Sequence, residues 1–286
     1  GYVAHTIADA VLAAYCIIVI LGIFQFAISA AQVPMLPMVD AAIFADTMSE
    51  PKEVYEWFDW LKTQVSYPIH IVSYGNLRQD TIDSAQGKGR WNFLTIPVFS
   101  ISKDTGKKGL LRRQCTSNYK IRPVHQQIRE MLGLAKGEKR KKGTHVELWM
   151  GISTDEQGRM KENQIKWIEN KYPLIEKNMS RQSCINWFKK HYNKTPPRSA
   201  CTFCPYKSNK EWQNLRDNYP KEWQDVVEFD NAIRVGTKND DQVFLHKSCV
   251  PIAEADLRTG AEKGQPNLDL FEDEDMDQEC EGMCGL

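Results

Sequence analysis

Residues 40–47 read Asp-Ala-Ala-Ile-Phe-Ala-Asp-Thr, and this short apolar run between two aspartates decides the fold class. An apolar run without alternation is typical of a strand that is buried on both faces of a parallel sheet. Pro51–Gln64 follows with apolar residues at helical spacing, and Pro68–Ser73 then repeats the strand pattern. This order predicts an α/β protein with a doubly wound, mostly parallel sheet, and it places Asp46 at the carboxyl end of a strand.

The segment before this run is strongly apolar. Ala10–Ala31 carries no charged residue, and its length of about 20 residues would span a bilayer as a helix. The β-branched run Tyr15–Leu21 instead fits a buried parallel strand, with Phe24–Ala31 as the helix packed behind it. Its flanks lack the basic residues that anchor membrane spans. We therefore expect a buried strand and helix, and a membrane anchor is the alternative.

The pattern continues along the chain. We expect a strand or hairpin arm at Trp91–Ser100, a helix at Pro123–Leu134, a strand at Val146–Ile152, and helices around Cys184–His191 and Glu211–Ala232. In terms of domains, we expect a nucleotide-binding-like α/β domain at residues 1–160, a helical cysteine-containing region at 161–250 and a flexible acidic tail at 251–286.

The formal net charge of zero hides an uneven distribution of charge. Lys103 to Lys142 is strongly basic, whereas the chain from Glu254 onward is strongly acidic. A basic segment attracts phosphate-rich partners, so this one is a candidate nucleic-acid contact, although a solvated loop is the alternative. Eight cysteines in a chain with no cleavable secretion signal suit a reducing compartment, and we expect a cytoplasmic protein.

Cysteine spacing points to a metal site. Cys201 and Cys204 are separated by two residues, which lets both thiolates turn towards one metal. Cys184, Cys115 and His191 are available to complete a ligand set. Thiolate sulfur suits zinc or an iron-sulfur cluster, and spacing does not separate the two. The alternative is a free dithiol or two small buried side chains.

Three stretches carry a further signal: Ala45-Asp46-Thr47 with Glu50, Gly151-Ile152-Ser153 through Asp155-Glu156 and Arg159, and Cys201-Thr202-Phe203-Cys204-Pro205. In their order and spacing they resemble the phosphoadenosine phosphosulfate reductase family, of the adenine nucleotide alpha-hydrolase (PP-loop) superfamily, in its phage and bacterial forms. The likeness implies a nucleotide-binding α/β fold and sulfur chemistry. It also implies a 4Fe-4S cluster, with zinc as the alternative, held by Cys115, Cys184, Cys201 and Cys204.

The resemblance also implies a nucleotide site that binds ATP with magnesium or an adenine sulfonucleotide. The family's glycine-rich phosphate loop corresponds here to residues 21–26, where only Gly22 and Gln25 match. Asp46 corresponds to a carboxylate that holds magnesium or a ribose hydroxyl, with a helix cap as the alternative. Arg159 corresponds to an arginine that grips phosphate or sulfate, with a surface ion pair as the alternative.

Two cysteines lie near the end of the chain. Cys280 and Cys284 are similar in placement to the tail cysteines of those reductases, which implies a catalytic thiol that swings into the site. Cys249 follows His246 and Lys247 and is a weaker candidate for a nucleophile, with a structural role favoured.

These observations lead to one functional hypothesis and one alternative. We expect an enzyme that carries out sulfonucleotide reduction or ATP-dependent sulfur transfer to nucleic acid, with a thiol reductant or sulfur donor as partner. The alternative is a non-catalytic scaffold or interaction protein that keeps the fold and the metal site. The bulky side chains at residues 23, 24 and 26 favour that alternative, because they obstruct close backbone approach to a phosphate.

Overall fold

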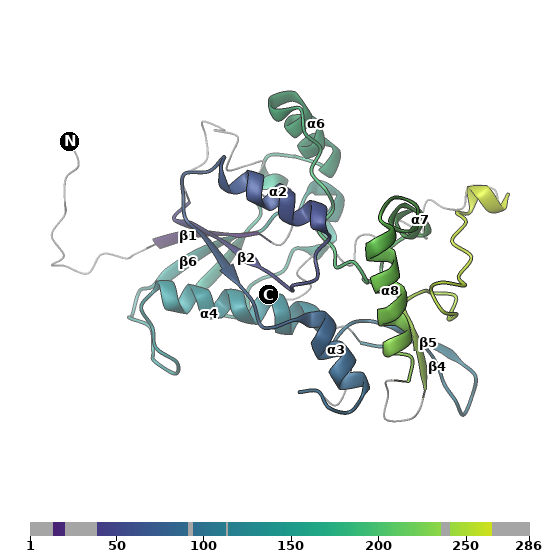
Figure 1. Cartoon of the computed structure of the whole chain (residues 1–286). Helices are drawn as coiled ribbons and strands as arrows, with labels where there is room; N and C mark the ends of the chain where they lie inside the picture. The colour runs from purple at the N-terminus through teal and green to yellow at the C-terminus, as the bar shows by residue number, and fades with distance from the viewer. Residues whose placement is uncertain (1–13, 21–38, 91–93, 113, 236–240, 265–286) are drawn as a thin grey trace.

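The computed structural model describes residues 14–20, 39–90, 94–112, 114–235 and 241–264 of the 286 (Figure 1). It is a mixed α/β protein with two sheets. The larger sheet has five strands in the order β3-β2-β1-β6-β7, and every pairing in it is parallel. Its strands are β1 (Ala14–Ile20), β2 (Ala41–Ala45), β3 (Ile69–Val72), β6 (His145–Trp149) and β7 (Ile168–Lys171).

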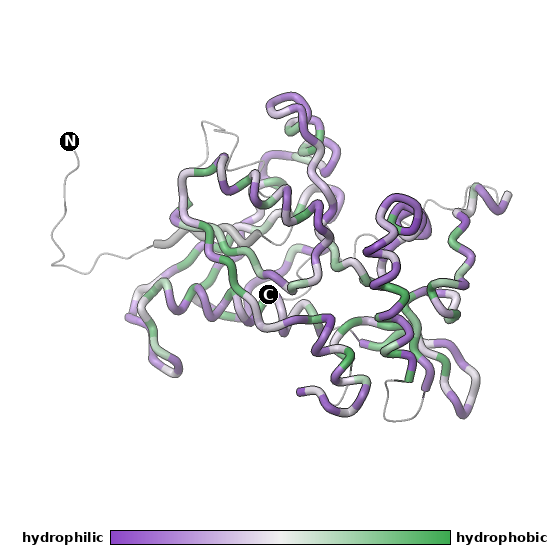
Figure 2. Tube along the Cα trace, in the orientation of Figure 1, coloured by the Kyte–Doolittle hydropathy of each residue, from purple (hydrophilic) through white to green (hydrophobic). Residues whose placement is uncertain are grey.

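Strand β2 is buried along its whole length, as its sequence predicts. Ala42 and Phe44 join one hydrophobic cluster, while Ile43 and Ala45 join another. The two clusters lie on opposite faces because successive side chains of a strand alternate. Helix α2 (Lys52–Lys62) covers the first face and helix α4 (Arg122–Met131) the second. Helices therefore protect both faces of the sheet, and the apolar parts of the trace gather along its strands (Figure 2).

Strand β1 lies at the centre of the sheet, paired with β2 on one side and β6 on the other. The strand expected at Tyr15–Leu21 is thus confirmed, whereas the helix expected at Phe24–Ala31 lies outside the described residues. No helix within the described ranges is long and apolar enough to cross a membrane.

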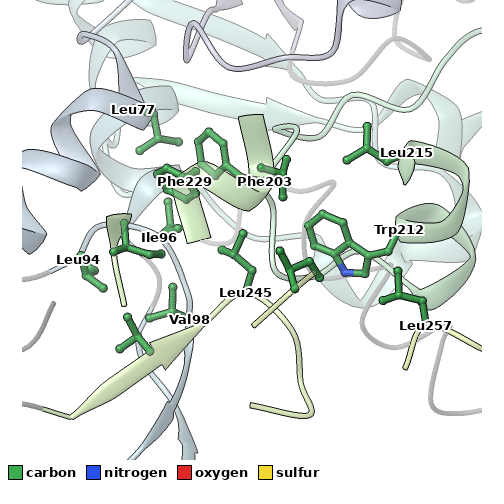
Figure 3. Close-up of a cluster of buried hydrophobic side chains, with 14 of the residues drawn as sticks. Leu77, Leu94, Ile96, Val98, Phe203, Trp212, Leu215, Phe229, Leu245 and Leu257 are labelled. Atoms are coloured by element: carbon green, nitrogen blue, oxygen red, sulfur yellow. The ribbon is translucent and has the colours of Figure 1, made fainter. Parts of the chain in front are cut away.

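The smaller sheet is antiparallel and joins distant parts of the chain. It contains β4 (Phe99–Ile101), β5 (Lys108–Leu110) and β8 (Gln242–Phe244), with β4 in the middle. Helices α7 (Asn209–Asn218) and α8 (Pro220–Ala232) pack near it around a third hydrophobic cluster, in which Trp212 is fully buried (Figure 3).

Several elements differ from the sequence expectations. Of the described residues 94–100, only Phe99 and Ser100 fall in the strand expected at Trp91–Ser100, because Leu94, Ile96 and Val98 pack into the third cluster as irregular chain. Helix α3 (Leu77–Ala85) and strand β7 were not predicted. Strand β7 lies beyond residue 160, so the large sheet extends past the expected domain boundary.

The remaining elements are η2 (Thr116–Ile121), η3 (Thr154–Arg159), α5 (Pro173–Glu176), α6 (Arg181–Tyr192) and η4 (Ala261–Lys263).

Candidate functional site

The loop after β2 engages the carboxylate of Asp46 locally. Its Oδ1 atom accepts hydrogen bonds from the backbone N–H of Met48 at 2.7 Å and from the hydroxyl of Tyr55 at 2.8 Å. Helix α2 begins at Lys52 with Pro51 as its N-cap and without a side-chain capping bond. Asp46 therefore shapes the loop, and the alternative interpretation of this residue as the cap of α2 is wrong.

A pocket beside this loop brings together three of the four predicted cysteine ligands. We call it the thiol pocket. It is lined by Thr47, Cys115, Lys120, Cys201 and Cys204 together with apolar neighbours. The three cysteines come from two parts of the chain that are far apart in sequence, which is the arrangement that a site built by tertiary structure requires.

Direct contacts fix the Cys201–Pro205 loop against the loop after β2. The hydroxyl of Thr47 lies 3.4 Å from the sulfur of Cys201, and the backbone N–H of Thr202 donates to the carbonyl of Ser49 at 2.9 Å. On its other side, the ring of Phe203 packs on that of Phe229 in the third hydrophobic cluster, with centroids 4.2 Å apart (Figure 3). The cysteine loop is thus held between the carboxyl edge of the parallel sheet and the smaller sheet's core.

A buried carboxyl group lies next to the thiols. Glu50 is 6% exposed, and its Oε2 accepts a hydrogen bond from the hydroxyl of Ser199 at 3.0 Å. Burial raises the pKa of Glu50, while the nearby positive charge of Lys120 opposes that shift. Burial and then the charge of Glu50 raise the pKa of the Cys201 thiol to about 12. Without a bound metal, Cys201 therefore stays protonated at neutral pH.

The segment that carries Cys115 and Lys120 has an unusual backbone. Element η2 is a π-helix that begins directly after Cys115 and continues into α4. Such short π segments contain a wider turn than an α-helix and occur often at functional sites. Here the wide turn lies between a thiol and an amine that both line the thiol pocket.

Cys184, the fourth predicted ligand, occupies a different environment. It lies in α6 and is fully buried in the cluster that also contains Trp57 and Phe188. Burial, followed by the charge of Asp155, raises the pKa of its thiol to about 11. The imidazole of His191, from the same helix, stacks on Trp187 with ring centroids 4.5 Å apart. Neither residue lines the thiol pocket.

The donor set of the thiol pocket fits a soft metal by its chemistry, because it offers three sulfur ligands. Tetrahedral zinc with Zn–S bonds of 2.3 Å requires sulfur atoms about 3.8 Å apart. Among the described residues, three potential ligand atoms lie within 4.8 Å of one another only at His145, Glu147 and Glu169, on β6 and β7. The three thiols are therefore spread more widely than the ligands of one zinc ion.

Arg159 lies in the loop after β6, at the same edge of the sheet as Asp46. Its guanidinium is 10% exposed and pairs with Glu156, itself 12% exposed. The ion pair that was the alternative interpretation is therefore present, but it is buried. The Nε and Nη2 atoms of Arg159 are buried without a hydrogen-bond partner among the described residues. These two donors are available to an anion.

Four predicted site residues, Gly22, Gln25, Cys280 and Cys284, lie outside the described residues. Cys249 is described: it is 5% exposed, has a φ of 57°, and its sulfur lies 3.8 Å from the carbonyl oxygen of Lys247. Burial raises the pKa of the Cys249 thiol, as expected for a structural cysteine.

Ser199 and Lys120 were missed as site residues by sequence reasoning. A usable signal was the position of Ser199 two residues before the Cys201–Cys204 pair. No protein-family model matches the chain, and searches of characterised proteins and of solved structures find no match either. The functional argument therefore rests on the fold and the geometry of the site.

Proposed function

We propose that this protein is an enzyme of sulfur chemistry that binds an adenine nucleotide over the carboxyl edge of its parallel sheet, next to the thiol pocket. The observation that carries the proposal is that the loop after β2 touches both the carboxyl edge of the parallel sheet and the cysteine loop. This loop leaves the sheet edge at Asp46 and contacts the cysteine loop through Thr47, Ser49 and Glu50. A nucleotide at the edge would therefore lie beside the thiols.

The order of the strands supports a nucleotide site. Consecutive strands leave β1 in one direction through β2 to β3 and in the other through β6 to β7. Ligands of open doubly wound sheets bind where the order reverses, beyond the carboxyl ends of the strands. We infer such a doubly wound arrangement here, with the ligand site beyond the carboxyl ends of β1 and β6.

Arg159 supports an anionic ligand. An unsatisfied buried donor destabilises a protein by about 1–3 kcal/mol, so two such donors on one guanidinium call for a partner. The planar guanidinium can hold a phosphate or sulfate through two parallel hydrogen bonds. A phosphate or sulfate of the nucleotide would meet this requirement at the correct edge of the sheet.

The thiol pocket supports sulfur chemistry. Cys115, Cys201 and Cys204 would hold an iron-sulfur cluster, or a zinc ion once the three thiols move closer together, and a fourth ligand would come from a residue other than Cys184. The bound group would keep the thiols deprotonated and supply a Lewis acid or redox centre. Lys120 lines the pocket as a cation that favours an anionic sulfur species.

Metal analysis and nucleotide binding test the proposal on the full chain. After anaerobic purification, we expect zinc, or iron with acid-labile sulfide, in a form that Cys204→Ser removes. We expect calorimetric titration to detect ATP or adenosine 3′-phosphate 5′-phosphosulfate, with at least tenfold weaker binding for Arg159→Ala. Arg216→Ala is the matched control, since Arg216 is 43% exposed and pairs with its neighbour Asp217. A chain that binds no nucleotide, whether it holds zinc or no metal, would be the non-catalytic scaffold.

A further inference from the structure

Two arginines converge on one tyrosine at the carboxyl end of β3. The guanidinium carbon of Arg90 lies 4.9 Å from the ring centroid of Tyr74, and that of Arg122 lies 5.0 Å from the same centroid. Arg122 also donates a hydrogen bond from Nη1 to the Tyr74 hydroxyl at 3.1 Å. Cation–π contacts of this kind hold a guanidinium in a fixed place.

Arg90 and Arg122 differ from the described arginines that form ion pairs with carboxylates. Among the described arginines, such ion pairs are formed by Arg78, Arg159, Arg198, Arg216, Arg234 and Arg258. In the described part of the chain, neither Arg90 nor Arg122 has such a pair, and both are exposed. Sharing one ring places their charges within about 10 Å, one Debye length at 0.1 M salt. Asp80, which accepts a hydrogen bond from the Tyr119 hydroxyl, interacts with Arg90 and offsets part of this charge. The remaining positive charge of the pair favours an anion.

The Arg90–Tyr74–Arg122 group lies close to the thiol pocket. The ring of Tyr74 meets that of Tyr119 edge to face, with centroids 5.4 Å apart. Tyr119 precedes Lys120, which lines the pocket. Leu77, three residues after Tyr74, lines the pocket too, and its backbone N–H donates to the carbonyl of Thr47 at 3.1 Å.

The Lys103–Lys142 segment does not form one basic surface. Its first lysines lie at the β4–β5 hairpin, whereas residues 136–143 form the loop between α4 and β6. These two parts lie on opposite sides of the molecule, with the length of α4 between them (Figure 1). The basic residues are therefore close together in the sequence but do not form a single docking surface. The arginine pair on Tyr74 lies beside the site, near Lys120, which lines the thiol pocket.

We propose that Arg90 and Arg122, held by Tyr74, dock a single-stranded nucleic acid whose base reaches the thiol pocket. Guanidinium groups bind phosphates and also stack on bases that have left the helical stack. A single strand fits better than a duplex, because a base must be unstacked to approach a recessed site. The inference rests on the proposed function for what happens to the bound nucleic acid, which would receive sulfur. Docking of the nucleic acid is tested separately.

Fluorescence anisotropy with a labelled 20-residue oligonucleotide of mixed sequence tests the docking. We expect the full chain to bind single-stranded RNA or DNA more tightly than the duplex. Arg90→Gln with Arg122→Gln should weaken binding at least tenfold, and the slope of log affinity against log salt should fall by about 1.4, given about 0.7 per lost contact on single strands. Tyr74→Leu should weaken binding while keeping both charges.

The matched control is Lys141→Gln with Lys142→Gln, which removes two charges from the exposed α4–β6 loop. We expect this variant to bind within twofold of the unchanged protein. No binding of the oligonucleotide, or equal losses in the arginine and lysine pairs, would overturn the inference. Titration of ATP on the same variants separates the two proposals, because loss of oligonucleotide binding with ATP binding retained concerns the docking site alone.

Discussion

Glu50 and Cys201 form an unusual pair of neighbours, a buried carboxyl group beside a partly buried thiol. Each disfavours ionisation of the other, since like charges in a site of low dielectric repel. Lys120 is the cation that favours the charged form of both groups. The site is therefore electrostatically incomplete without a further positive charge, which is the condition that a metal ion would satisfy.

The effect of Glu50 on the thiol leads to a first prediction. Glu50→Gln removes the negative charge that contributes to the raised pKa of Cys201, so the pKa of this thiol should fall. In metal-free protein at pH 8, we expect iodoacetamide to modify Cys201 about three to ten times faster, as a shift of up to one pKa unit implies. Peptide mass spectrometry over time measures the rate. Glu56→Gln, on the exposed side of α2, should leave the rate unchanged.

The same substitution has a consequence for stability. The pKa of Glu50 is higher in the folded chain than in the unfolded chain, so its contribution to stability is present below its unfolded pKa and is lost as the pH rises. Glu50→Gln should therefore raise Tm at pH 8 by about 2–4 °C, the shift given by ~1 kcal/mol in a protein of this size. Calorimetric scans should show this gain shrinking towards pH 4. A gain that grows on acidification would contradict the assignment.

Substitution of Cys184, in the apolar cluster, and of Cys204, in the thiol pocket, should affect stability and metal content differently. Cys184→Ala leaves a cavity in the packed cluster of α2 and α6, so we expect it to lower the free energy of unfolding by about 1–2 kcal/mol. Its metal content should stay within 20% of the unchanged protein, whereas Cys204→Ser should lose the metal. Denaturant unfolding and elemental analysis on both variants measure these effects. Loss of metal in Cys184→Ala would restore it as a ligand.

At the scale of elements, the cap of α7 contributes to holding the cysteine loop. Ser208 and Glu211 form a capping box, in which each side chain bonds to the other's backbone N–H. Glu211 also pairs with Arg198, just before the loop. We expect Ser208→Ala to destabilise the fold by about 1 kcal/mol, as the loss of such a cap does elsewhere. Chemical denaturation should detect it, with Ser66→Ala in the loop between α2 and β3 as the control, since Ser66 is exposed.

The sequence anticipates the elements that have strong apolar patterns. Strands β1, β2 and β3 and helices α2 and α4 were predicted from these patterns, and β2 is buried along its whole length. Strand β7 was missed because it reads Ile-Glu-Asn-Lys and lies at the edge of the sheet, where only Ile168 is buried. Helix α3 lacks a clear apolar face and begins at an Asn76 cap.

Sequence reasoning recovered the part of the site that has a local sequence pattern. The spacing of Cys201 and Cys204 is local and can be read directly from the chain. The contact between Thr47 and Cys201 joins residues 154 positions apart, and no local pattern reports it. From the sequence, Cys184 was as good a candidate metal ligand as Cys115, yet its helix places it in an apolar cluster.

At the scale of the whole molecule, the cysteine loop connects the two sheets. Through Thr202 it contacts the edge of the parallel sheet, and through Phe203 it enters the core beside the smaller sheet. A metal that orders this loop should also order the loop after β2. We therefore expect metal-loaded protein to bind ATP at least fivefold more tightly than metal-free protein, a coupling of ordinary size. Paired calorimetric titrations measure it, and equal affinities would show that the two sites are independent.

The π-helix before α4 sets the angular position of Cys115. Removing one residue from Thr116–Ile121 would convert the wide turn into an ordinary α-helical one. The residues next to the deletion on its N-terminal side, Cys115 among them, would then rotate by about 100° around the helix axis, while α4 stayed packed on the sheet. The sulfur of Cys115 would swing out of the thiol pocket in an otherwise intact protein. The extra residue of the π-helix therefore sets the rotation of Cys115 relative to α4. With this rotation, α4 can pack its apolar face on the core while Cys115 lines the thiol pocket.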